Sequence, residues 1–136
     1  MRRVLMIVLI CSSLGMAEDL LVVTGAKSPI TAVDAVTLRA IYLKKRRFWK
    51  EMKLTPINLP ADSMLRRRFE THIVAMSARK LDDYWMKMHY KGTRPPFQVR
   101  SVEGVIGYIK KIKGAIGYIP ESKADTQMKI LYRIKG

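Results

Sequence analysis

The sequence has 136 residues, which is enough for one domain with a single hydrophobic core. It is strongly basic, with 26 Lys and Arg against 11 Asp and Glu and a formal net charge of +15. Such a surface either attracts anionic partners or serves solubility alone. The single cysteine, Cys11, excludes an internal disulfide.

The N-terminus has the pattern of a secretory signal peptide. A basic start at residues 2–3 precedes an apolar stretch at 4–14 and the small-residue exit Gly15-Met16-Ala17. We therefore expect a signal peptide at 1–17 and one periplasmic domain at 18–136. The apolar stretch is shorter than the ~20 residues of a membrane helix, so no transmembrane segment is expected after processing. Once the signal peptide is removed, 24 Lys and Arg remain against 11 acids. An exported protein does not meet nucleic acid, so the anionic candidates are small ions, lipid headgroups, polysaccharides and acidic proteins.

The first half of the exported chain is expected to alternate strand and helix. Leu20 to Thr24 is rich in β-formers and predicts a strand. Thr31 and Asp34 resemble a capping pair for a helix that continues to the basic run Lys44 to Arg47. Thr55 to Leu59 predicts a second strand.

Two helices are predicted next, beginning near Ser63 and at Ser77. Helical spacing puts these apolar side chains on their inner faces: Leu65, Phe69, Ile73 and Met76, then Leu81, Tyr84, Trp85 and Met88. We expect Trp85 to be a core anchor. Met64, Met76 and Met88 continue these faces, which favours core filling over metal binding.

The tetrapeptide Ile-Gly-Tyr-Ile occurs twice, at 106–109 and 116–119. The first copy has helical spacing behind Ser101, whereas the second lies in a short apolar run that predicts a buried strand. Gly117 in that strand indicates close approach of either packed protein or a ligand. With a last strand at Met128 to Ile134, the pattern predicts a single α/β domain with a mixed sheet and helices on both faces.

No set of residues predicts catalysis, a metal or a cofactor. His72 and His89 are separated along the chain and lack an acidic set of metal-ligand spacing. No glycine-rich nucleotide loop is present. The sequence therefore favours a binding or interaction module over an enzyme.

Residues 59–70 carry the candidate anion site. A strand leads through a short turn into a helix, whose free N–H groups and positive end attract an oxyanion. Ser63 would add a hydroxyl and Arg66 or Arg67 a charge, and Asp62 could accept a proton from HPO₄²⁻. In the competing interpretation Asp62 or Ser63 only caps the helix and the arginines are solvated.

Four segments together resemble the short phosphate ABC transporter substrate-binding proteins of the periplasmic binding protein-like family. In order they are LRAIYLKKRRFW at 38–49, LP-x-DS-x-x-R-x-x-F at 59–69, Tyr84-Trp85 with Gly92 and Pro95-Pro96, and GAIGYIP at 114–120. The resemblance covers nearly the whole exported chain. It implies the fold of one lobe of a periplasmic binding protein, phosphate as ligand and a transporter permease as partner.

The chain departs from this family pattern at two places. The segment that usually reads I-F-x-G-K lacks its glycine at Ile41-Tyr42-Leu43-Lys44. Of the family's R-S-D-G-S-G-T phosphate loop only Ser63 is present, with Leu59 and Ala61 at the arginine and aspartate positions. Two functions therefore stay open. One is binding of phosphate or a related oxyanion for ABC transport. The other is a half-clamp without a small ligand, whose basic face docks an envelope protein or anionic surface.

Overall fold

The core of the protein is a five-stranded mixed sheet with the strand order β5-β4-β6-β1-β7. The computed structural model describes residues 18–136, so the predicted signal peptide and Cys11 lie outside the described residues. The strands are β1 (Leu20–Gly25), β2 (Phe48–Trp49), β3 (Met52–Lys53), β4 (Thr55–Asn58), β5 (Phe97–Gln98), β6 (Ala115–Pro120) and β7 (Met128–Ile134). The helices are α1 (Ala35–Tyr42), α2 (Met64–Phe69), the π-helical η1 (Glu70–Val74), α3 (Ala78–Tyr90), α4 (Val102–Lys111) and the 3₁₀ turn η2 (Glu121–Lys123).

The sheet is mixed because its two halves pair differently. The strand β4 runs parallel to both β5 and β6, with Pro56 opposite Ile116 and Ile57 opposite Phe97. On the other side β1 pairs antiparallel with β6 and β7, and it is buried from Leu20 to Thr24. The expected single α/β domain with a mixed sheet is confirmed.

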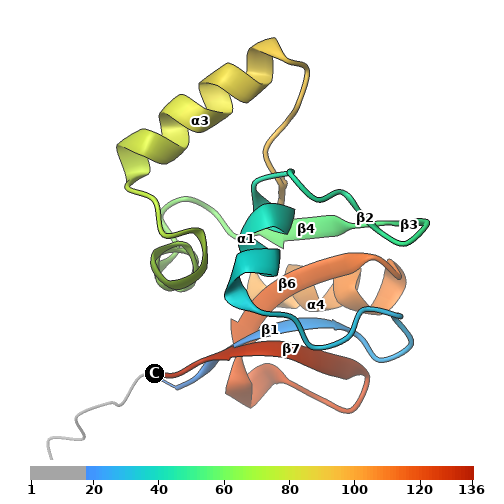
Figure 1. Cartoon of the computed structure of the whole chain (residues 1–136). Coiled ribbons are helices and arrows are strands. Elements are labelled where there is room, and N and C mark those ends of the chain that lie inside the picture. Colours follow the sequence, from blue (N-terminus) through green and yellow to red (C-terminus); the bar gives the residue numbers. More distant parts are fainter. Residues whose placement is uncertain (1–17) are drawn as a thin grey trace, which may run out of the picture.

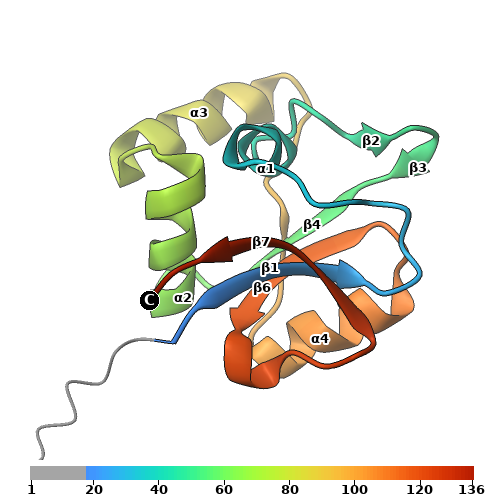
Figure 2. The same ribbon diagram turned by 60° about the horizontal axis from the view of Figure 1, so that its bottom comes forward.

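Helices flank both faces of this sheet, as predicted. Figure 2 shows α4 against one face and α1 and α2 on the side of the other, and Figure 1 shows α3 extending away from the sheet. Figure 1 shows that β2 and β3 project as a small separate hairpin beside the start of β4. Neither this hairpin nor the two-residue β5 was predicted, since strands so short have no detectable period.

The helix predicted from Ser63 is correct at its start and wrong in its course. Regular α-helix ends at Phe69, and Glu70–Val74 continues as a π-helical turn that stops at Ala75, whose φ is 54°. Met64 is 77% exposed, so its expected core role is wrong. Trp85 is partly buried and packs against the core instead of lying inside it.

Gly117 is explained by packing. A Cβ built at Gly117 would collide with Cγ1 of Val105 on α4, so the glycine lets this helix lie directly on β6. Of the two readings of Gly117, the structure supports packed protein.

Lys44, where the expected glycine is absent from the sequence, directly follows the C-cap of α1. Its φ is 60°, in the left-handed region that glycine enters without steric cost and lysine does not. The turn after α1 therefore carries a long cationic side chain at a left-handed position.

Candidate functional site

The turn between β4 and α2 is the predicted anion site, and Ser63 is the N-cap of α2. Its hydroxyl accepts a hydrogen bond from the N–H of Arg66 at 3.4 Å, and its own N–H donates to the carbonyl of Pro60 at 2.9 Å. This is the capping role of the competing interpretation. Asp62 is exposed in the same turn and is not the cap.

Several N–H groups at this helix start have no acceptor among the described residues. They are the N–H groups of Asp62, Met64 and Leu65. Such orphan donors are expected at the first turn of any helix, where they carry part of the positive end of the helix dipole. They can bind an anion from solvent, although α2 is only six residues long.

The two predicted arginines behave differently. Arg66 donates from Nε to Glu70 Oε1 at 2.9 Å, and from Nη1 to the Leu59 carbonyl at 2.9 Å and Gln98 Oε1 at 3.4 Å. Its charge is therefore largely neutralised by Glu70, and its guanidinium joins the turn to α2 and β5. Arg67 is exposed beside it and has no ion pair among the described side chains.

Tyr118 on β6 fixes the first part of the turn. Its hydroxyl accepts a hydrogen bond from the N–H of Leu59 at 3.1 Å and donates to Oδ1 of Asn58. Its ring stacks on Phe69 with a centroid distance of 4.3 Å. Burial raises the pKa of Tyr118 far above its ordinary value, so the group is a neutral hydroxyl at physiological pH.

Sequence reasoning missed this role of Tyr118. The available signal was a hydroxyl inside an otherwise apolar buried strand, because a buried tyrosine oxygen usually finds a hydrogen-bond partner. Nothing in the sequence indicated that the partner would lie sixty residues away at Asn58.

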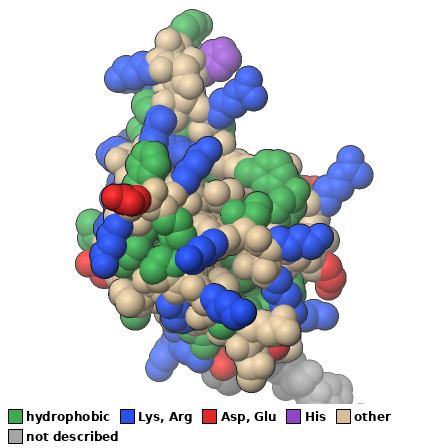
Figure 3. Space-filling model, turned by 90° about the vertical axis from the view of Figure 1, so that its right-hand side faces the viewer, with side chains coloured by type: hydrophobic (Ala, Val, Ile, Leu, Met, Phe, Trp, Pro, Cys, Tyr) green, Lys and Arg blue, Asp and Glu red, His purple; other side chains and the backbone are tan. Residues whose placement is uncertain are grey.

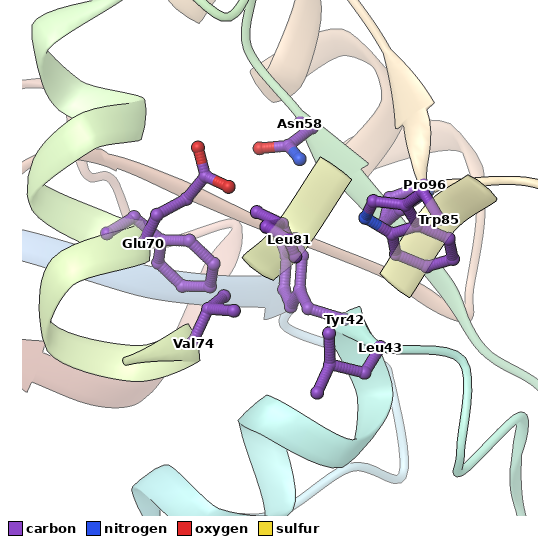
Figure 4. Close-up of a pocket in the computed structure, with 9 residues that line it drawn as sticks. Tyr42, Leu43, Asn58, Glu70, Val74, Leu81, Trp85 and Pro96 are labelled. Carbon is purple, nitrogen blue, oxygen red and sulfur yellow. The ribbon is translucent and has the colours of Figure 1, made fainter. Parts of the chain in front are cut away.

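A small cavity lies next to this turn, between α1, η1, α3 and the end of β4 (Figure 4). Figure 4 shows the polar ends of Asn58 and Glu70 on one side and Leu43 and Val74 on the opposite side. Its volume of about 10 Å³ is near the minimum for one water molecule. The cavity is too small for phosphate, so an oxyanion at this end of β4 would have to bind at the open turn.

The described residues contain neither a cluster of metal ligands nor a membrane-spanning helix. Within residues 18–136 no three His, Cys, Asp or Glu side chains gather as a metal site, and His72 and His89 are exposed on η1 and α3. None of the helices described is long and apolar enough to cross a bilayer.

Comparison with solved structures places this fold among phosphate-binding transport proteins. A protein of Clostridium perfringens, described as a phosphate ABC transporter substrate-binding protein with bound phosphate, superimposes with a TM-score of 0.69 at 20% identity. An ABC-type phosphate transport receptor of Vibrio cholerae gives 0.66 at 18%, and PstS of Borrelia burgdorferi gives 0.65 at 19%. Each match covers 85% of this chain and 46 to 47% of the other. No family model and no curated protein matches the sequence.

The chain thus spans less than half the length of these solved proteins. At identities of 20% and below, the likeness establishes the fold and not the ligand. The protein has the α/β fold of one part of a solute-binding protein of the phosphate transport type.

Proposed function

We propose that the protein is an exported, periplasmic solute-binding-type protein that binds phosphate or a related oxyanion at the start of α2. The observation that carries this proposal is the set of unpaired N–H groups at residues 62, 64 and 65, directly after the carboxyl end of the parallel strand β4. Ligands of open α/β sheets bind at that end of the strands. The solved proteins of the same fold are named for phosphate transport.

Each side chain of the turn would have a different role in binding the oxyanion. Ser63 would keep its capping bond to Arg66 N–H and donate its hydroxyl proton to the oxyanion. Arg67, which is exposed and free of ion pairs among the described residues, would supply the charge. Arg66 would position the turn through Leu59 and Glu70. The carboxylate of Asp62 would favour a protonated oxyanion such as HPO₄²⁻ over sulfate, because only the former can donate a hydrogen bond to it.

This open turn covers one side of a ligand only. Because the other side of the ligand is left uncovered, we propose that a second chain completes the site. A transporter permease would then receive the ligand. In this proposal the protein is a binding module and not an enzyme.

A second function is favoured by the neutralised state of Arg66. Because Glu70 already balances this guanidinium, the turn has less free charge than the sequence suggested. The half-clamp would then have lost its small ligand, and its basic surface would dock an envelope protein or an anionic surface.

Calorimetric titration of the purified protein with phosphate and with sulfate tests the first function. Ser63→Ala should weaken the binding free energy of phosphate by about 0.5 to 2 kcal/mol. This value includes the loss of the capping hydrogen bond of Ser63. Arg67→Gln should weaken phosphate more at low salt than at high salt, because ions screen an exposed charge. Lys111→Gln is the matched control, since Lys111 is an exposed cation at the end of α4 and away from this turn. Absence of saturable phosphate binding at millimolar concentration would favour the interaction module.

A further inference from the structure

A second, larger recess opens near the start of β4, at the end of the strand away from Ser63. We call it the basic hollow. It has a volume of about 310 Å³ and is formed by the segment after α1, the β2–β3 hairpin, the start of β4 and the turn after α3. Its lining residues are Lys44, Arg46, Arg47, Phe48, Lys53, Leu54, Pro56, Gly92, Thr93 and Arg94. The four residues of β4 separate it from the α2 turn by about 10 Å at the usual rise of a strand.

The hollow concentrates positive charge without a compensating acid. Five of its lining residues are Lys or Arg and none is Asp or Glu. None of the five forms an ion pair with any residue that the structure describes, whereas Arg66, Lys110, Lys123 and Arg133 do. Figure 3, which views the end of the molecule that carries β2 and β3, shows many Lys and Arg side chains and few Asp or Glu. Like charges gathered in one recess repel each other, and a bound anion removes that cost.

Arg47 is held in place by the protein. Its Nη2 donates to Oγ1 of the buried Thr93 at 2.7 Å, and its Nε donates to the carbonyl of Lys44 at 3.3 Å. No described residue accepts from its Nη1. An arginine whose planar guanidinium is already oriented loses little entropy when it binds a phosphate oxygen.

Lys44 is kept in the hollow at a conformational cost. Its φ of 60° is one that glycine would adopt more easily, and it lies at the left-handed position that commonly ends a helix, directly after the C-cap Leu43. Burial, with the nearby charges of Lys53 and Arg47, lowers the pKa of its ammonium group. Both observations describe a cation that is destabilised in the empty protein and would gain from an anionic partner.

The remaining wall of the hollow is apolar. Phe48, Leu54 and Pro56 are the apolar residues that line it, and Phe48 is 54% exposed. A volume of about 310 Å³ lies at the lower limit for pockets that hold small organic ligands. The combination of clustered cations and an apolar wall suits a phosphate group attached to a small organic body better than an inorganic ion.

We propose that the basic hollow is a binding site for a small organic phosphate monoester. Its phosphate oxygens contact Arg47, Lys44 and Lys53, and its carbon skeleton packs on Phe48. A free ester and the headgroup of an anionic lipid both carry this chemistry. The site is independent of the one proposed at Ser63, because the two share no residue.

Titration of the purified protein with glycerol 3-phosphate, followed by calorimetry, tests the proposal. A parallel arm measures co-sedimentation with vesicles of phosphatidic acid in phosphatidylcholine, with pure phosphatidylcholine as the blank. Saturable binding of the soluble ester identifies a free metabolite as the source. Binding to phosphatidic acid vesicles alone identifies the lipid headgroup. Both results support the proposal if they depend on the hollow.

Dependence on the hollow is measured with substitutions that remove one charge at a time. Arg47→Gln should weaken binding about ten-fold or more, as expected for loss of a charge-assisted hydrogen bond, and Lys53→Gln by a smaller factor. Lys111→Gln on α4, an exposed cation outside the hollow, should leave it unchanged. Ser63→Ala should also leave glycerol 3-phosphate binding unchanged, which separates failure here from failure at the α2 turn.

Lys44→Gly gives a readout that a purely structural role cannot mimic. Glycine adopts a left-handed backbone more easily than lysine, so the substitution should raise the thermal midpoint. Loss of the cation should at the same time weaken binding of the phosphate ester. The proposal is wrong if neither probe binds at millimolar concentration. It is equally wrong if the Arg47, Lys53 and Lys44 variants bind as tightly as the parent protein.

Discussion

Replacement of Tyr118 by phenylalanine should destabilise the protein through the turn that precedes α2. The change removes only the hydroxyl oxygen and keeps the ring that stacks on Phe69. That oxygen accepts from the Leu59 N–H at 3.1 Å and donates to Asn58 Oδ1. Leu59 is 3% exposed and Asn58 is 7% exposed, so neither group can turn freely to water.

The magnitude follows from the groups that are left behind. A buried donor that loses its partner costs about 1 to 3 kcal/mol. The Leu59 N–H has no alternative acceptor in a strand end, and it should account for most of the loss. The amide of Asn58 lines the small cavity and can reorient toward a water there, so its contribution should be smaller. We expect Tyr118→Phe to lower the free energy of unfolding by about 2 to 3 kcal/mol.

Urea unfolding followed by tryptophan fluorescence measures this quantity, with two tyrosines as controls. The hydroxyl of Tyr42 donates to the carbonyls of Ile57 and Ile116, so Tyr42→Phe deprives carbonyl acceptors and leaves no N–H unpaired. It should cost about 1 kcal/mol. Tyr108→Phe, at a partly exposed tyrosine on α4, should cost less than about 0.5 kcal/mol. If Tyr118→Phe proves no more costly than Tyr108→Phe, the hydroxyl does not hold the turn.

Three further results are expected. Gly117→Ala should lower the free energy of unfolding by about 1 to 3 kcal/mol, because the added methyl group meets Val105. Val105→Ala in the same chain should recover part of that loss. Additive effects of the two substitutions in a double-mutant cycle would contradict the contact. Trp85→Ala should cost about 1 to 3 kcal/mol in urea unfolding, less than for a fully buried tryptophan, because only part of its ring is covered. The backbone N–H of Gly136 and then Arg133 lower the pKa of the Asp19 carboxyl, so its stabilising effect should be complete at neutral pH and disappear as pH falls through that lowered pKa. Carbon NMR titration should place the midpoint below 3.8, and a midpoint at or above that value would rule out the contacts.

The main strands and helix starts could be predicted because their signals are local. Ser77 and Ser101 are the caps that the sequence indicated, and β1 and β6 are buried apolar runs as expected. The π-helical course of Glu70–Val74 could not be predicted, since its apolar residues still satisfy helical spacing. Met64 shows the same limit, because a position on the first turn can share a period with the core and still face solvent.

The candidate site was predictable in its cap and not in its charges. A serine before a helical pattern identifies an N-cap, and Ser63 has that role. Whether an arginine is free depends on residues that arrive from elsewhere in the chain. Gln98 on β5 and the Leu59 carbonyl meet Arg66 only after the sheet has formed. The basic hollow was missed for the same reason, because Arg94 joins the run from Lys44 to Arg47 only through the path of α3.

The cations near the two ends of β4 differ in whether an acidic side chain pairs with them, and this difference bears on function. At the α2 turn the partly buried Arg66 is paired with Glu70 and has little charge left to offer a ligand, whereas the exposed Arg67 beside it has no ion pair among the described residues. In the basic hollow five cations line one recess, and Lys44 adopts a left-handed backbone conformation. A group of charges that is unfavourable in the empty protein is stabilised by any anion that binds the folded state alone, by RT ln(1 + [L]/Kd). Anions should therefore raise the thermal midpoint chiefly through the hollow, and Lys53→Gln should reduce that rise more than Arg67→Gln does. The reverse order would place the main anion site at the α2 turn.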